Sequence, residues 1–167
     1  MNIERIQKIY DTIALDILNT VKIKRDGKLF DLIEIEVYLL NKGLGIDDTF
    51  IHKNEKQMNS EGIYFHYSGV DICRGGGDGS EIYCGILIRG ISNTNETIYG
   101  PGKVAYDRSK GKQKRLIEAV KHEDTGYILA DDTSAQGKIN NVIFKLPRVN
   151  LGQTTIVKKE EDQVLVI

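Results

Sequence analysis

The sequence predicts an α+β fold: a single compact domain around a curved, mostly antiparallel β-sheet, with an N-terminal helix. Three observations support this prediction. Apolar residues recur at helical spacing near the N-terminus, alternating segments typical of β-strands follow, and turn residues separate them. The 167 residues, 40% hydrophobic and 28% charged, suit one soluble globular domain that spans residues 1–167.

The first elements are a helix and a hairpin. Residues 3–19 are predicted to form an amphipathic helix, whose apolar stripe consists of Ile3, Ile6, Ile9, Ile13 and Ile17. A short strand is expected at residues 21–24. Asp26-Gly27 then favours a tight hairpin turn, because these residue types tolerate the positive φ angles that such turns require.

The next predicted strand carries the main candidate chemistry. The apolar residues expected to point toward the core are Ile33, Ile35 and Val37. The opposite face would present Glu34, Glu36 and Tyr38. An acid–base group would thus lie beside an aromatic ring. The alternative is a half-buried strand whose glutamates simply face water.

The remaining elements are assigned more coarsely. We expect a polar loop with one short helix at residues 42–60, a glycine-rich turn at 74–80, a second loop at 92–97 and a helix at 108–122. The remaining strands are expected at 62–67, 81–91, 127–130, 142–146, 154–157 and 164–167.

Composition excludes several classes of protein. No apolar run approaches the roughly 20 residues needed to cross a bilayer, and the N-terminus lacks the pattern of a signal peptide. The two cysteines, Cys73 and Cys84, form no disulfide framework and are expected to be free. Because the three histidines are scattered in the sequence, neither a metal nor another cofactor is expected. We expect a cytoplasmic protein, located in the cytoplasm or the nucleoid.

Charge argues against a strong non-specific nucleic-acid binder, because the net charge is −1 and the pI about 6.3. The distribution is nevertheless uneven. Residues 103–121 contain seven basic and two acidic residues, a local net charge of +5. This segment is either a phosphate-binding surface or a solvated helix and loop.

Several motifs, read in order, resemble the alkyladenine (3-methyladenine) DNA glycosylase family. They span residues 12–152, nearly the whole chain. The motifs are Ala14-Leu15-Asp16-Ile17-Leu18, Glu34-Ile35-Glu36-Val37-Tyr38-Leu39, Asp48 to His52, Gly77-Asp78-Gly79, Gly85-Ile86-Leu87-Ile88-Arg89, Gly100-Pro101-Gly102-Lys103-Val104 and Arg148-Val149-Asn150-Leu151. The resemblance implies the compact mixed fold of that family.

The resemblance also implies an activity and the residues that perform it. The family flips a damaged purine out of the duplex and hydrolyses its bond to the sugar. Glu36 matches the catalytic glutamate, which activates water. Tyr38 matches a ring that stacks on the flipped base, His52 the pocket histidine, and Arg89 an arginine of the pocket wall.

The stretch from Tyr64 to Asp71 leaves alternatives open. The family has a second stacking ring there and, three residues later, a tyrosine wedge that fills the gap in the duplex. Tyr64 and Tyr67 keep this spacing, although the chain is about two residues shorter here. Alternatively, His66 is the second ring and there is no wedge. Asp71 could instead pair with His66 as a further acid–base group.

The expected partner is double-stranded DNA with a damaged purine, bound by a monomeric enzyme of base excision repair. Phosphate contacts are expected from Lys103, Arg108, Lys110 and Lys112. One alternative is a divergent hydrolase or nucleoside- or single-strand-binding protein on the same fold. The other is a domain that has lost enzymatic activity.

Overall fold

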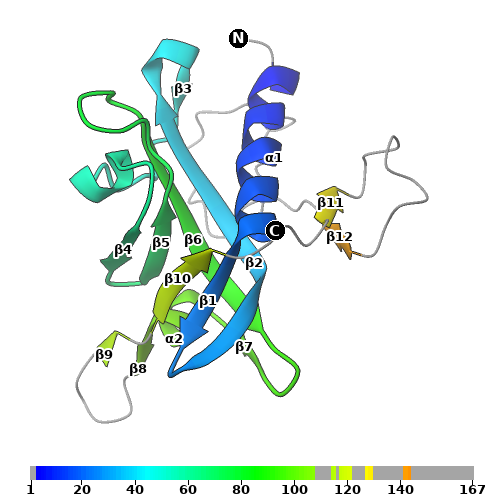
Figure 1. Cartoon of the computed structure of the whole chain (residues 1–167). Helices are drawn as coiled ribbons and strands as arrows, with labels where there is room; N and C mark the ends of the chain where they lie inside the picture. The colour runs from blue at the N-terminus through cyan, green and yellow to red at the C-terminus, as the bar shows by residue number, and fades with distance from the viewer. Residues whose placement is uncertain (1–2, 108–113, 116, 122–126, 130–140, 144–167) are drawn as a thin grey trace.

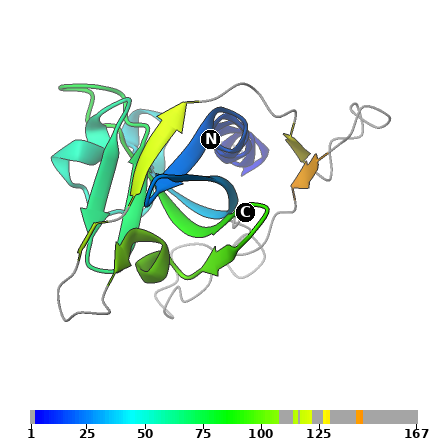
Figure 2. The same ribbon diagram turned by 60° about the horizontal axis from the view of Figure 1, so that its bottom comes forward.

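The computed structural model describes residues 3–107, 114–115, 117–121, 127–129 and 141–143, and the elements below lie within these ranges. Its centre is a sheet in the order β10-β1-β2-β6-β5-β4, in which all neighbours are antiparallel. These strands are β10 (Ile117–Lys121), β1 (Val21–Arg25), β2 (Lys28–Asn41), β6 (Tyr83–Ser92), β5 (Gly69–Cys73) and β4 (Ile63–His66). The sheet curls into a half-barrel (Figures 1 and 2). The predicted α+β class is confirmed.

Helix α1 (Ile3–Thr20) packs against one face of this sheet (Figure 1). Its buried residues lie on one stripe: Tyr10, Ala14, Ile17 and Leu18. Of the predicted stripe, Ile17 is buried, Ile6, Ile9 and Ile13 are only partly buried at its side, and the prediction that Ile3 belongs to it is wrong, because Ile3 is 49% exposed. They join a core cluster with alternate residues of the strands, among them Ile35 and Val37 of β2 and Ile86 and Ile88 of β6. The opposite face of the sheet is therefore available for polar side chains.

The predicted hairpin between β1 and β2 is confirmed. Asp26 and Gly27 have φ angles of 49° and 79°, so both central residues are left-handed. This backbone matches the twist of the flanking strands. The turn sets the β1–β2 register, in which Arg25 lies opposite Lys28.

A β-bulge in β2 interrupts the predicted alternation at Ile33. The register between β2 and β6 shifts between Leu32 and Glu34 and again between Glu34 and Ile35. Leu32 and Ile35 both reach the core, whereas Ile33 is 36% exposed. The prediction that Ile33 packs with Ile35 is therefore wrong, because the extra residue of a bulge breaks the period of two.

The prediction of a helix at residues 108–122 is also wrong at every residue of this range that the structure describes. Lys114–Arg115 is β9, which pairs with β8 (Tyr106–Asp107), and residues 117–121 are β10. All five residues of β10 pair with β1. Backbone pairing with the sheet edge has overridden the helical preference of the Ile-Glu-Ala-Val-Lys segment.

Two shorter regions refine the predictions. The region expected to hold one short helix contains two 3₁₀ helices, η1 (Lys42–Leu44) and η2 (Glu55–Met58), and strand β3 (Ile46–Asp47), which pairs with β2. Strand β5 was not predicted. All five of its residues are buried, so it lacks the alternation that marks a half-exposed strand.

The remaining elements lie toward the C-terminal side. They are β7 (Thr97–Tyr99), which pairs with β6, helix α2 (Pro101–Ala105), and the parallel pair β11 (Tyr127–Leu129) and β12 (Asn141–Ile143). Strands predicted at 154–157 and 164–167 lie outside the described residues. Within the described ranges, no helix combines the length and apolar character needed to cross a membrane.

Candidate functional site

The register of four strands places the candidate residues in one row. Glu36 of β2 lies opposite Leu87 of β6, Leu87 opposite Asp71 of β5, and Asp71 opposite Tyr64 of β4. Residues that lie opposite one another point to the same face of a sheet. The row therefore lies on the face away from α1, because the intervening residues of these strands belong to the core cluster.

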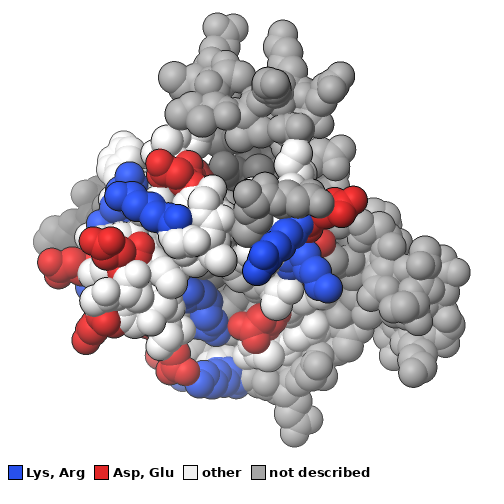
Figure 3. Space-filling model, turned by 90° about the horizontal axis from the view of Figure 1, so that it is seen from above, with Lys and Arg blue, Asp and Glu red and all other residues white. Residues whose placement is uncertain are grey.

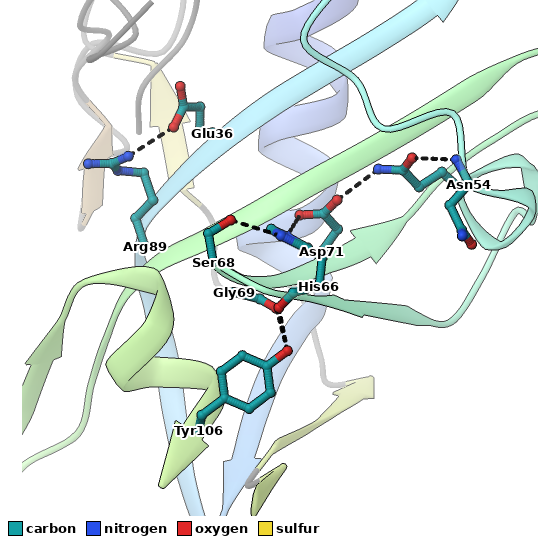
Figure 4. A network of polar contacts seen from close by, with 9 residues as sticks. Glu36, Asn54, His66, Ser68, Gly69, Asp71, Arg89 and Tyr106 are labelled. Carbon is teal, nitrogen blue, oxygen red and sulfur yellow. Dashed lines mark hydrogen bonds and ion pairs between the residues drawn. The ribbon is translucent and has the colours of Figure 1, made fainter. Parts of the chain in front are cut away.

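At one end of the row, Arg89 binds two glutamates of β2. Its Nη1 donates a hydrogen bond of 3.0 Å to Oε2 of Glu36, and its Nε one of 2.9 Å to Oε1 of Glu34. Figure 4 shows Arg89 reaching Glu36 across the sheet. Burial by itself lowers the pKa of Arg89. The hydrogen bonds and charges of the two glutamates raise this pKa by more, so the net shift is upward. We call Glu34, Glu36 and Arg89 the carboxylate–guanidinium cluster.

Glu36 is the unusual member of this cluster. Glu36 is 1% exposed, so the alternative that this glutamate simply faces water is wrong. Its Oε2 accepts the Arg89 hydrogen bond, but its buried Oε1 has no hydrogen-bond partner among the described residues. Buried polar atoms are nearly always paired, so this oxygen is a position where a bound molecule or a water can donate a hydrogen bond.

Toward the other end of the row, Asp71 and His66 form a second polar cluster. Nε2 of His66 lies 3.1 Å from Oδ1 of Asp71, and Oγ of Ser68 lies 2.9 Å from Nδ1 of His66 (Figure 4). Nε2 of Gln57 donates a 2.8 Å hydrogen bond to Oδ2 of Asp71. Both oxygens of this buried carboxylate are therefore paired.

The rings of His52 and Tyr64 lie against His66. The His52 and His66 rings lie 4.6 Å apart, centre to centre, at 70°, and the Tyr64 and His66 rings are stacked at 5.6 Å and 29°. The pKa of His52 is lowered below 6.5. Desolvation is the largest cause, and the charge of the nearby His66 is the second. His52, His66 and Asp71, with Gln57 and Ser68, are called the imidazole cluster below.

Local structure explains why Gln57 and Asp71 meet. Gln57 lies in η2, whose first turn is fixed by a capping box with Asn54. Gly85 of β6 permits the close approach, because a Cβ atom there would lie 2.5 Å from Nε2 of Gln57 and 2.7 Å from Oδ2 of Asp71. The hydroxyl of Tyr106 also donates to the carbonyls of His66 and Gly69, which holds the β4–β5 turn (Figure 4).

A cavity of about 130 Å³ opens over the imidazole cluster. The residues that line it are Tyr38, Phe50, Ile51, His52, Gln57, His66, Ser68, Asp71 and Leu87. Glu36 is not part of this lining. Leu87 lies in the row between Glu36 and Asp71, so the two clusters are neighbours on one face rather than a single set of hydrogen-bonded groups.

The structure brings most of the predicted residues to this face. Tyr38, His52 and His66 line the cavity, Tyr64 stacks on His66, and Arg89 binds Glu36. Tyr67 lies in the β4–β5 turn and is 85% exposed. Lys103 is an exposed residue of α2, and the predicted phosphate contacts Arg108, Lys110 and Lys112 lie outside the described residues.

Sequence reasoning missed Glu34, Gln57 and Ser68 as site residues. The Asn54-x-x-Gln57 capping box could have placed Gln57 at the start of a helical turn, but not against Asp71. The two cysteines are free, as predicted. Burial raises the pKa of both thiols to about 12, so Cys73 and Cys84 stay protonated.

No protein-family model, no curated protein and no solved structure matched this chain in our comparisons. Function therefore has to be argued from the geometry of the site.

Proposed function

We propose that this protein is a hydrolase of N-glycosidic bonds that flips and removes alkylated or deaminated purine bases from DNA, with Glu36 as the general base. The observation that carries the proposal is the environment of Glu36. Its carboxylate is buried, one oxygen is held by Arg89, and the other has no partner among the described residues.

This environment suits the chemistry of glycosidic hydrolysis. A carboxylate has to orient and deprotonate a water molecule for attack at the sugar carbon. Arg89 donates a charge-assisted hydrogen bond to Glu36 and so fixes the direction of the carboxylate. Oε1 then accepts a hydrogen bond from the attacking water. The negative charge also stabilises the positive charge that develops on the sugar.

Rings beside Glu36 supply a place for the base. Tyr38 follows Glu36 on the same face of β2 and, together with His52, lines the cavity. Flat side chains of this kind stack on any base and give recognition without sequence preference. The volume of about 130 Å³ lies below the roughly 300–1,000 Å³ of pockets for drug-sized ligands, which favours a single base over a whole nucleotide.

An exposed ring next to the cavity supports action on a duplex. Tyr67 adjoins His66 in the β4–β5 turn, and 85% of it is accessible. An aromatic side chain in this position can enter the gap that a flipped base leaves and keep the duplex open. Tyr64 and His66 are the two alternatives for the second stacking ring, and their mutual stacking at 5.6 Å supports a platform that both rings form.

The charge pattern favours a second candidate, a hydrolase of free nucleosides or single strands. Basic and acidic side chains alternate over the described part of the face shown in Figure 3, without one continuous basic area. With a net charge of −1, the chain lacks the basic balance typical of duplex binders. In this second candidate function, Glu36 is still the base and only the substrate differs.

Single-turnover excision tests the proposal. A duplex that carries 1,N6-ethenoadenine or hypoxanthine is incubated at low salt with the wild type, with Glu36→Gln and with Glu118→Gln. Glu118 is a matched control, because this glutamate lies on β10 in an exposed ion pair with Lys24. We expect abasic product from the wild type and from Glu118→Gln only. Excision by Glu36→Gln at the wild-type rate would contradict the assignment.

The same experiment separates the two candidates. Free nucleosides and a single-stranded oligonucleotide with the same lesion are tested in parallel. Release of the base from these substrates, without release from the duplex, favours the second candidate. Loss of that activity in Glu36→Gln would again assign the base to Glu36.

A further inference from the structure

The imidazole cluster has a property that glycosidic hydrolysis at Glu36 does not use. Two of the three histidines of the chain meet there with a buried carboxylate. One potential ligand atom from each of His52, His66 and Asp71 lies within 4.8 Å of the other two. We propose that these three side chains bind one divalent transition-metal ion, best matched by Zn²⁺, in a site with an open coordination position.

The spacing of His66 and Asp71 already fits such an ion. In a tetrahedral zinc site, with ligand atoms at about 2.0–2.2 Å from the metal, neighbouring ligands lie about 3.4 Å apart. The distance between Nε2 of His66 and Oδ1 of Asp71 is 3.1 Å. The ligand atom of His52 lies within 4.8 Å of the other two, so it has to approach by at most about 1.4 Å to reach the same spacing. Its side chain is exposed and lies in the loop between β3 and η2, where such a movement is possible.

Hydrogen bonds around the three ligands orient them as metal sites require. Metal-bound imidazoles use their second nitrogen to bind an oxygen atom, and Nδ1 of His66 lies 2.9 Å from Oγ of Ser68. Gln57 binds Oδ2 of Asp71 and leaves Oδ1 directed toward His66. The serine hydroxyl both donates and accepts, so Ser68 can support His66 before and after it binds metal.

The balance of charge favours a cation in this position. Asp71 is 3% exposed, and no Lys or Arg among the described residues forms an ion pair with it. A buried carboxylate without a permanent positive partner is costly, and a divalent ion removes that cost. A metal at Nε2 of His66 requires the N–H of the neutral imidazole to lie on Nδ1, where Oγ of Ser68 can accept its hydrogen bond.

The cavity holds the rest of a coordination shell. A water needs about 10–15 Å³ of such space, so a cavity of about 130 Å³ has room for water beside a bound ion. Two imidazoles and one carboxylate, completed by water, form the open type of zinc site, and the donor set suits zinc rather than magnesium or calcium. The proposal does not require Glu36 as the base, because Leu87 lies between the two clusters. The ion would share the cavity with the base of the proposed substrate, since His52 lines it in both cases.

Metal binding to the full chain, without any substrate, tests this inference. The metal-free protein is titrated with Zn²⁺ by calorimetry and with Co²⁺ by visible absorption. We expect one ion per chain and the absorption of a four- or five-coordinate Co²⁺ site without thiolate bands. His52→Gln and Asp71→Asn are expected to weaken Zn²⁺ binding at least 100-fold. Because His52 is exposed, its variant should remain folded even if Asp71→Asn does not.

His122, the third histidine of the chain, provides a matched control, because it is not one of the three proposed ligands. We expect His122→Gln to bind Zn²⁺ with wild-type affinity. Unchanged stoichiometric binding by His52→Gln, equal loss in His122→Gln, or no binding at micromolar metal by the wild type would overturn the inference. Each result is independent of excision by Glu36, so failure here leaves the proposed hydrolase intact.

Discussion

Two buried carboxylates lie in one row of the sheet but have opposite environments. Glu36 is paired with the permanent charge of Arg89 and keeps one oxygen without a partner among the described residues. Asp71 has both oxygens paired, but its partners, His66 and Gln57, carry no permanent charge. The first arrangement fixes the direction of a buried carboxylate and leaves one oxygen open, as the proposed general base requires. The second fixes the geometry of the carboxylate and leaves its charge to be balanced by a proton or a cation.

This difference shows how one sheet face can hold two kinds of chemistry. A guanidinium remains protonated in proteins, so the carboxylate–guanidinium cluster keeps its charges through ordinary changes of solvent. Imidazoles change protonation near neutral pH and bind metals, so a response to either is expected from the imidazole cluster. Leu87, which is 7% exposed, lies between them.

Removing the guanidinium should cause the largest effect. Arg89→Met leaves Glu36 buried without its positive partner, and breaking a buried pair in this way costs about 3–5 kcal/mol. We expect the free energy of unfolding to fall by about 3 kcal/mol, because Arg89 is partly exposed. Denaturant titration measures this change.

The control is Lys28→Met, which breaks the exposed ion pair with Glu96. Pairs of this kind contribute about 1 kcal/mol or less. If the two variants lose equal stability, the contrast between the buried Glu36 and an ordinary surface glutamate is wrong.

Gly85→Ala should have the next largest effect, and it acts on the imidazole cluster. The added Cβ would meet both Gln57 and Asp71 at less than 3.0 Å, so their hydrogen bond has to move. Overpacking of this kind costs about 1–3 kcal/mol. Thermal or denaturant unfolding measures the loss of stability.

Gly43→Ala is the matched control for this prediction. Its nearest neighbour would be Oδ1 of Asn41 at 3.4 Å, and its φ angle is not left-handed. We expect a change within about 0.5 kcal/mol. Equal stability of wild type and Gly85→Ala would show that the approach of Gln57 to Asp71 is looser than the geometry indicates.

A smaller effect, confined to binding, is expected from the exposed ring beside the imidazole cluster. Tyr67→Ala removes an 85% exposed side chain, so the free energy of unfolding should not change. If the ring inserts into the duplex, affinity for lesion-containing DNA should fall about tenfold, since base–aromatic stacking is worth about 1–3 kcal/mol. Fluorescence anisotropy measures the affinity. Tyr99→Ala, which removes a 60% exposed ring on β7, should bind like the wild type.

Sequence alone predicted the parts of this face that depend on one strand. Alternation placed Glu36 and Tyr38 on one side of β2, and Asp26-Gly27 defined the hairpin before it. The bulge at Ile33 could not be predicted, because it arises from the register between β2 and β6. Periodicity within a single segment carries no information about such pairing.

The imidazole cluster was less accessible to sequence reasoning for the same reason. It needs β5, a strand of only five residues that is buried on both faces, and it needs η2 to place Gln57 against Asp71. Three scattered histidines predicted no metal site, yet the fold brings His52 and His66 together across fourteen positions of sequence. Distance along the chain is a poor guide when a loop and a hairpin converge on one cavity.

The smallest expected effect is the pH dependence of stability that comes from His52. Burial and the nearby His66 lower the pKa of His52 in the folded protein, whereas the unfolded chain titrates near 6.5. As the pH falls through 6.5, the unfolded state takes up the proton first, so stability is lost until the lowered folded pKa is passed. His52→Gln should not show this loss of stability at low pH. Unfolding of both proteins at pH 7.5 and pH 5 measures this difference, with His122→Gln as the control. If wild type and His52→Gln lose equal stability between these pH values, His52 does not make the imidazole cluster respond to protons, and this part of the contrast with the permanently charged cluster is wrong.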